Sequence, residues 1–68
     1  MEQRKFLVIT NASGSAKRAI PIENIIRILE FQDAKQTIID YYCSKEEERV
    51  CARESFDSIM AGNHIVVL

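Results

Sequence analysis

The sequence has no tryptophan, and it contains only two glycines, one proline, two cysteines and one histidine among its 68 residues. It also lacks a long apolar run, since stretches such as Phe6–Ile9 and Ile65–Leu68 fall far short of the ~18 residues that a membrane span needs. The segment Met1–Phe6 has neither the apolar core nor the cleavage site of a signal peptide. These absences predict a cytoplasmic protein that has no membrane partner.

An excess of charge of one sign is also lacking, because nine Lys and Arg residues stand against ten Asp and Glu residues, for a formal net charge of -1. This balance gives no general electrostatic reason to bind nucleic acid or anionic lipid, although it does not exclude a local basic patch. The apolar fraction of 47% argues against disorder of the whole chain. The length indicates one domain over residues 1–68 and excludes multidomain enzymes and repeat arrays.

A domain of this size buries only about 60% of its unfolded surface, so it needs support from disulfides, metals or association. Cys43 and Cys51 do not make a disulfide framework in a reducing compartment. With His64 they offer three ligands at most and no close pair, whereas structural zinc usually binds four. Nothing in the sequence positions His64 as the base of a cysteine nucleophile. We therefore predict no metal, no cofactor and no enzymatic activity, and we expect oligomerisation to supply the support.

Three segments in the first half are rich in β-branched residues and predict strands. Lys5–Thr10 runs into a polar loop, and Ala19–Ile22 is a short edge because its proline lacks the N–H that a central strand needs. Ile25–Phe31 is interpreted as a third extended segment. A helix over Ile22–Glu30 is the rival interpretation, since its isoleucines also fit helical spacing, but β-branched side chains lose rotamer freedom in a helix.

The second half predicts a hairpin. Gln32–Gln36 is a polar connector of hairpin length, and Thr37–Ser44 alternates in the manner of a half-buried strand. A charged turn at Lys45–Glu48 leads to a second alternating strand, Arg49–Glu54, with its arginines outward. With the turn centred in this charged run, Cys43 opposes Val50, and the apolar faces of the two strands come together.

A short helix follows the hairpin. Ser55 is its predicted N-cap, and Gly62 is a natural residue to end it. An apolar stripe at helical spacing is made of Phe56, Ile59 and Met60. His64–Leu68 has the character of a final strand. The sequence therefore predicts an α+β fold, a small antiparallel β-meander of four to five strands with one short C-terminal helix.

The segment Phe6–Gly14 resembles the opening strand and turn of the small flagellar FlbD-type proteins. The isoleucine-rich segment Ala19–Glu30, the Thr-x-Ile strand start at Thr37–Ile39 and the helix start within Val50–Ser55 are similar to the later parts of that family's pattern. The likeness covers most of the chain as a pattern of apolar positions and turns.

Two features depart from that pattern. Lys45–Glu48 stands where the family has a glycine hairpin turn, and His64–Leu68 has no counterpart in it. The same segments also resemble the strand-rich middle of LytTR-type DNA-binding domains, in which a hairpin and a Ser-started helix follow an isoleucine strand. The chain is shorter than such a domain and lacks the basic stretch after its helix. Neither resemblance supplies a catalytic residue.

Basic residues suggest an alternative function. The arginines of the Arg49–Glu54 strand lie on one side of it, and with a nearby tyrosine they make a small platform for single-stranded nucleic acid. Cross-strand pairing with Glu30 and Asp40 is the more ordinary role for such arginines, so nucleic acid is not the favoured partner. The candidate nucleic-acid face comprises Arg27, Arg49, Arg53 and Tyr42.

The predicted strands carry more apolar surface than a two-turn helix covers, and uncovered sheet faces and edges bind partners or aggregate. We therefore predict a non-catalytic protein-interaction module that self-associates through its sheet as a homodimer, and that binds a further protein of unknown identity. His64–Leu68 either stays with its own chain or is exchanged between chains. The candidate interface comprises Phe6, Leu7, Ile38, Tyr42, Ile65 and Val66.

Overall fold

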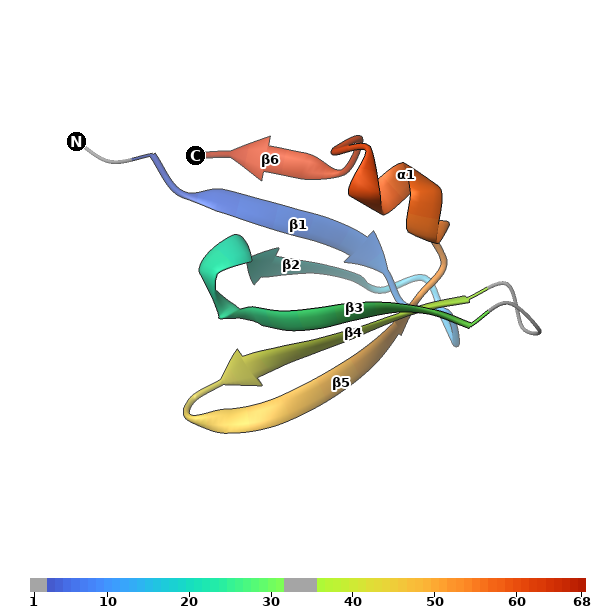
Figure 1. Ribbon diagram of the computed structural model, residues 1–68, viewed down its shortest axis with the longest axis horizontal. Helices are drawn as coiled ribbons and strands as arrows, with labels where there is room; N and C mark the ends of the chain where they lie inside the picture. The colour runs from blue at the N-terminus through green and yellow to red at the C-terminus, as the bar shows by residue number, and fades with distance from the viewer. Residues whose placement is uncertain (1–2, 32–35) are drawn as a thin grey trace.

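The computed structural model describes residues 3–31 and 36–68. Its strands and helix, in chain order, are β1 (Lys5–Thr10), β2 (Lys17–Pro21), β3 (Ile25–Phe31), β4 (Gln36–Cys43), β5 (Glu46–Ala52), α1 (Phe56–Met60) and β6 (Ile65–Val67). Within these residues the strands form two three-stranded sheets (Figure 1). Sheet A has the order β2-β1-β6 and sheet B the order β3-β4-β5, with antiparallel pairing throughout.

The chain changes sheet at a 3₁₀ turn, Ile22–Asn24 (η1), which separates β2 from β3. After this turn β3 pairs with β4 rather than with β2. Later in the chain, β6 returns to pair with β1 on the side opposite β2. The small, mostly antiparallel fold with one short helix is confirmed. The single meander of four to five strands is wrong, since the described residues hold six strands in two sheets. A meander requires each strand to lie beside the previous one, and η1 breaks that order.

The strand predictions of the first half are confirmed. Lys5–Thr10 and Ile25–Phe31 are β1 and β3, so the rival helix over Ile22–Glu30 does not form. The predicted edge Ala19–Ile22 falls within β2 and η1, and β2 is an edge strand that ends at Pro21. In these segments strand propensity outweighs helical spacing, because β-branched side chains pack well on a pleated surface.

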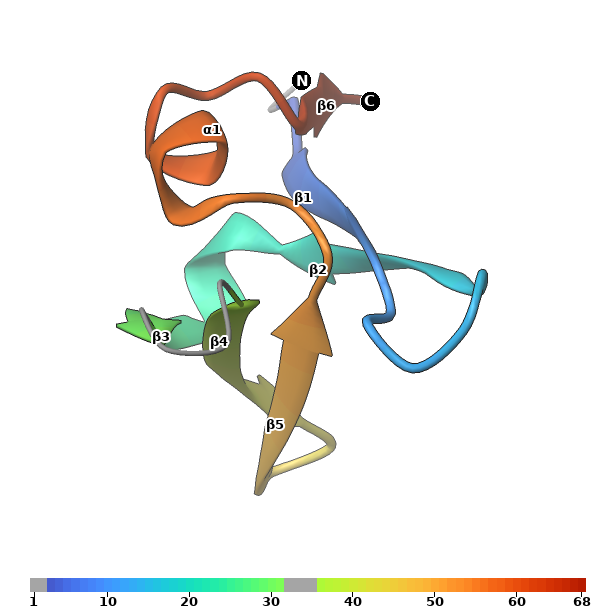
Figure 2. The ribbon, with the colours of Figure 1, turned by 90° about the vertical axis from the view of Figure 1, so that its right-hand side faces the viewer.

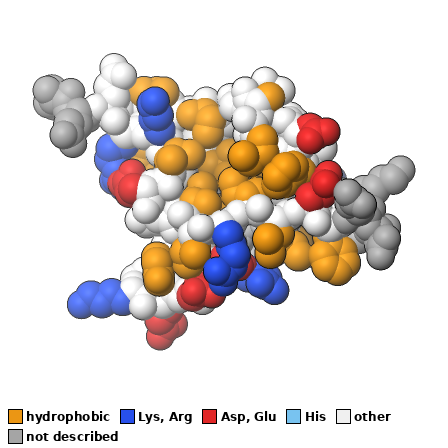
Figure 3. All heavy atoms as spheres, viewed as in Figure 1, with side chains coloured by type: hydrophobic (Ala, Val, Ile, Leu, Met, Phe, Trp, Pro, Cys, Tyr) orange, Lys and Arg blue, Asp and Glu red, His pale blue; other side chains and the backbone are white. Residues whose placement is uncertain are grey.

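The inner faces of the two sheets pack on each other, and Figure 2 shows β1, β2 and β6 above β3, β4 and β5 with α1 at the side. Each sheet is thus the main cover of the other, which corrects the expectation that the short helix covers a single sheet. Hydrophobic side chains still reach the surface between β1 and β3 (Figure 3). The buried core comprises Leu7, Ile9, Ile20, Ile39, Tyr41, Val50, Ala52 and Ile59.

The β4–β5 hairpin is tighter than predicted. Its loop has two residues, Ser44 (φ 52°) and Lys45 (φ 72°), and Cys43 pairs with Glu46. Positive φ at both loop residues is the type I′ geometry, which matches the twist of the flanking strands. The predicted opposition of Cys43 and Val50 is therefore wrong, and Val50 pairs with Ile39. The two registers differ by an even number of residues, so the same side chains still face the core.

The helix ends are as predicted. The Ser55 hydroxyl accepts a hydrogen bond from the Ser58 N–H at 3.2 Å, and Gly62 adopts φ 82° just after the helix. The N–H groups of Gly62 and Asn63 donate to the carbonyls of Ile59 and Ser58 at 3.1 and 3.3 Å, which is the Schellman pattern. These bonds end α1 a few residues before β6 begins.

The helical stripe is narrower than predicted. Ile59 is buried and Phe56 is half-buried, but Met60 is 60% exposed. Met60 projects past the rim of the core because a five-residue helix has room for few inward side chains.

A sheet junction, made of Thr10, Thr37 and Glu54, joins the end of sheet A to the end of sheet B. The Glu54 carboxylate accepts hydrogen bonds from the Thr10 N–H at 2.8 Å and from the Thr10 hydroxyl at 2.9 Å. The Glu54 carbonyl accepts another from the fully buried Thr37 hydroxyl at 2.8 Å. Backbone bonds reinforce the junction, because the Arg53 N–H donates to the Thr10 carbonyl at 2.9 Å.

We expect the double substitution Ser44→Asn with Lys45→Gly to raise the free energy of unfolding by ~1 kcal/mol. Positive φ is sterically unfavourable for serine and lysine, whereas asparagine and glycine adopt it readily. Urea unfolding measures this change. The matched control is Glu46→Gly in the adjoining strand, which should lower stability by a similar amount. A loss of stability in the double variant would show that the loop does not have this turn geometry.

Candidate interaction surface

The structure divides the predicted interface residues among three places. Phe6 and Val66 are paired neighbours on the outer face of sheet A. Leu7 is 1% exposed and Ile65 packs against the core, so Leu7 has no surface to offer a partner. The remaining predicted interface residues, on the outer face of sheet B, are Ile38 and Tyr42.

The outer face of sheet A has an apolar end. Phe6 on β1 lies between Pro21 of β2 and Val66 of β6 in the registers of the two strand pairs. The Arg4 guanidinium lies over the Phe6 ring, with its carbon 5.1 Å from the ring centroid. An aromatic side chain between two edge strands, covered only in part by a cation, is a surface suited to contact with another protein.

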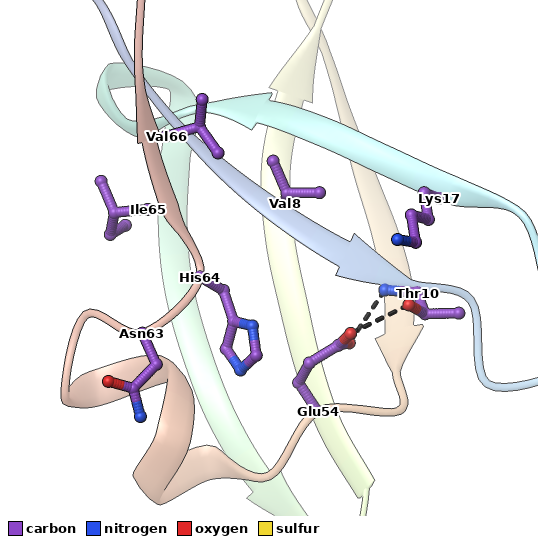
Figure 4. Close-up of a pocket in the computed structure, with 8 residues that line it drawn as sticks. All are labelled: Val8, Thr10, Lys17, Glu54, Asn63, His64, Ile65 and Val66. Atoms are coloured by element: carbon purple, nitrogen blue, oxygen red, sulfur yellow. Dashed lines mark hydrogen bonds between the residues drawn. The ribbon is translucent and has the colours of Figure 1, made fainter.

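The same face has a polar hollow of about 400 Å³ at its other end (Figure 4). Glu54 turns toward Thr10, and the His64 ring lies between Glu54 and β6. Burial by itself raises the pKa of Glu54, but the backbone and side-chain hydrogen bonds to its carboxylate, those from Thr10 among them, help to outweigh it, and that pKa is below its usual value. The lining residues are Val8, Thr10, Lys17, Glu54, Asn63, His64, Ile65 and Val66.

Ser58 and His64 also meet beside this hollow, with the serine hydroxyl 2.8 Å from the imidazole Nε2. The Asn63 amide donates to the same hydroxyl at 3.4 Å. Both oxygens of Glu54 accept bonds from Thr10, so this carboxylate is engaged at the sheet junction. The Ser58–His64 contact joins α1 to the residue that directly precedes β6.

The outer face of sheet B carries an apolar row across its three strands. Leu29, Ile38 and Cys51 stand opposite one another in the strand registers. Phe31 adjoins this row on one side, and Tyr42 lies on the other side beyond Asp40; they are each about half exposed, at 53% and 52%. The predicted interface residues Ile38 and Tyr42 thus share a face with each other, and not with Phe6 or Val66.

A charged row stands next to this apolar row. Asp40 lies between Arg27 and Arg49, which donate to its carboxylate at 2.6 and 2.7 Å, and Arg27 also binds Glu47 at 3.1 Å. The hydrogen bond from Arg49, assisted by that from Arg27, overcomes burial and lowers the pKa of Asp40 to about 2. The expected cross-strand pairing of Asp40 is confirmed.

These ion pairs bear on the alternative nucleic-acid face. Two arginines and two carboxylates balance one another in the charged row, so Arg27 and Arg49 contribute little net positive potential. Arg53 is exposed beyond the end of β5, and Tyr42 is exposed on the neighbouring strand.

The edge strands of the described residues differ in charge. Lys17 and Arg18 lie on β2, Arg27 on β3, and the charged run Glu46–Arg49 opens β5. Charged side chains on an edge discourage pairing with another chain. β6, whose sequence is Ile65–Val67, has no charged side chain.

Comparison with protein-family models, curated proteins and solved structures finds no significant match to this chain. The resemblances to FlbD-type and LytTR-type proteins stay predictions. In the described part of the chain, no helix is long and apolar enough to cross a bilayer. The surfaces themselves are therefore the basis for proposing a function.

Sequence reasoning missed Glu54 and Ser58. Glu54 directly precedes the helix cap Ser55, and an acidic residue at that place is normally solvated. Its partner Thr10 is 44 positions away, a separation that no local pattern reveals. The signal in the sequence that could have pointed to Glu54 is the position of a carboxylate between the end of a strand and a helix cap.

We expect the charged row to make stability depend on acid. The folded pKa of Asp40, about 2, lies below its ordinary value of 3.8, so its contribution is full above 3.8 and is lost as the pH falls toward 2. Asp40→Asn should be less stable at neutral pH and should lose less stability across that acid range, as measured by urea unfolding. Glu46→Gln, at an exposed position, is the control. Equal acid sensitivity of Asp40→Asn and the unmodified chain would contradict this assignment.

The sheet junction gives a second prediction. Glu54→Ala leaves the part-buried Thr10 N–H without its acceptor and should cost about 1–3 kcal/mol of stability. Glu54→Gln keeps an acceptor oxygen at the same place and should cost less. Urea unfolding of both variants tests this, and equal losses would show that the hydrogen bond to Thr10 does not account for the effect.

Proposed function

We propose that this protein is a non-catalytic protein-interaction module that self-associates through sheet A. The observation that carries the proposal is the exposure of three consecutive apolar residues in and just after β6: Val66 is 42%, Val67 46% and Leu68 77% exposed. Exposed apolar surface on an edge strand is a typical site of protein association.

The neighbouring face supports the same function. Phe6 pairs with Val66 in the β1–β6 register, so the apolar surface continues from β6 onto the centre of the sheet. Association would cover this surface and would add stability to a domain with a small core.

Protein is a better partner than nucleic acid for this chain. Arg27 and Arg49 already share Asp40, and the chain as a whole has a formal net charge of -1. Binding to phosphate backbones draws on uncompensated positive charge.

Sedimentation equilibrium of the full chain from micromolar to millimolar concentration tests the proposal. We expect a reversible monomer–dimer equilibrium, and we expect Val66→Lys to weaken it at least tenfold, because association would bury an unpaired charge. The matched control is Leu29→Lys, which places the same charge at a similarly exposed apolar position on sheet B. A monomer at every concentration would refute self-association, and a larger effect of Leu29→Lys would assign it to sheet B.

A further inference from the structure

The free edge of β6 exposes backbone groups as well as apolar side chains. The Val8 N–H donates to the His64 carbonyl at 2.9 Å, and Arg4 and Leu68 exchange two backbone bonds of 3.1 and 2.9 Å. These alternate residues of the β6 segment therefore face β1. In an antiparallel ladder the residues between them, Ile65 and Val67, direct their backbone groups to the opposite side.

That opposite side has no neighbouring strand among residues 3–31 and 36–68. The Ile65 N–H makes a long 3.5 Å bond to the Gly62 carbonyl. The Val67 N–H and the carbonyls of Ile65 and Val67 are directed to the free edge. Such an edge fits an added extended strand, which is the β-augmentation mode of recognition.

We infer that β6 of one copy pairs antiparallel with β6 of a second copy, about a two-fold axis at Val66. This inference rests on the proposed self-association and specifies its geometry. Ile65 of each copy then stands opposite Val67 of the other, and the Val67 N–H donates to the Ile65 carbonyl across each pair. The Ile65 N–H would exchange its long 3.5 Å bond to the Gly62 carbonyl for a bond to the Val67 carbonyl of the other copy. The two copies of sheet A become one continuous six-stranded sheet.

Charge favours a second copy of β6 as the added strand. The segment Ile65–Val67 carries no charged side chain, whereas β2, β3 and β5 all do, so two copies of β6 meet without placing a charge against an apolar edge. Lys5 pairs with Val67, so in the dimer its two copies lie on β1 strands that are three strand spacings apart. That separation is about 14 Å, longer than the ~8 Å screening length at physiological ionic strength.

The outer face agrees with this arrangement. Val66 would meet Val66 of the second copy, and each valine already adjoins Phe6 of its own chain. An apolar row of Phe6, Val66, Val66 and Phe6 would then cross the two-fold axis without interruption. An isologous contact of this kind is closed, so it gives a dimer rather than a fibre.

Disulfide trapping tests the inference in the full chain. Cys43→Ser and Cys51→Ser remove the native thiols, and Val66→Cys is then added. Val66 occupies a non-hydrogen-bonded position of the new ladder, where facing Cα atoms lie about 4.5 Å apart, within the range of a disulfide. We expect mild oxidation to convert most of this variant to a covalent dimer. Ala19→Cys in the same background, exposed on the charged β2 edge, is the matched control and should stay mainly monomeric.

A second variant reports on the backbone itself. Val67→Pro removes the N–H directed to the free edge, where β1 does not need it, and should weaken dimerisation at least tenfold in sedimentation equilibrium while the circular dichroism spectrum is kept. If the unmodified chain dimerises but Val66→Cys gives no more cross-linking than Ala19→Cys, the β6 pairing is refuted and self-association survives. If the unmodified chain is monomeric throughout, both fail.

Discussion

The fold depends on the contact in which one glutamate holds the ends of both sheets. Glu54 accepts two hydrogen bonds from Thr10 at the end of β1 and, through its carbonyl, one from Thr37 at the start of β4. Because these groups are partly or fully buried, each would be costly to leave without a partner. The contact lies just after β5 and directly before the helix cap Ser55, so it ties the start of α1 to the ends of both sheets.

What the sequence predicts well in this protein is local. The strands Lys5–Thr10 and Ile25–Phe31 follow from β-branched composition, and the helix ends follow from Ser55 and Gly62, whose roles depend on a few neighbouring residues. The hairpin register, in contrast, does not follow from local composition. Ser44 and Lys45 adopt positive φ without the glycine that normally signals such a turn, so composition alone places the turn too late.

The division into two sheets also cannot be predicted from local sequence patterns. It rests on the η1 turn and on contacts between residues far apart in the chain, such as Thr10 and Glu54, and these leave no periodic trace. Prediction of the candidate interface is limited in the same way. Alternation along β4 correctly places Ile38 and Tyr42 together, but whether Phe6 joins them depends on which sheet each strand enters, and the sequence does not state this.

The pairing of β1 with β6 has a consequence for how the chain matures on the ribosome. Lys5 pairs with Val67, so β1 acquires its second neighbour only after the other described strands and the helix have been synthesised. Until β6 has been made, β1 has only β2 beside it, and late closure of a contact so distant in sequence favours slow folding. During that interval the flank of β1 that β6 later covers is an unpaired strand edge, the kind of edge that pairs readily with other chains.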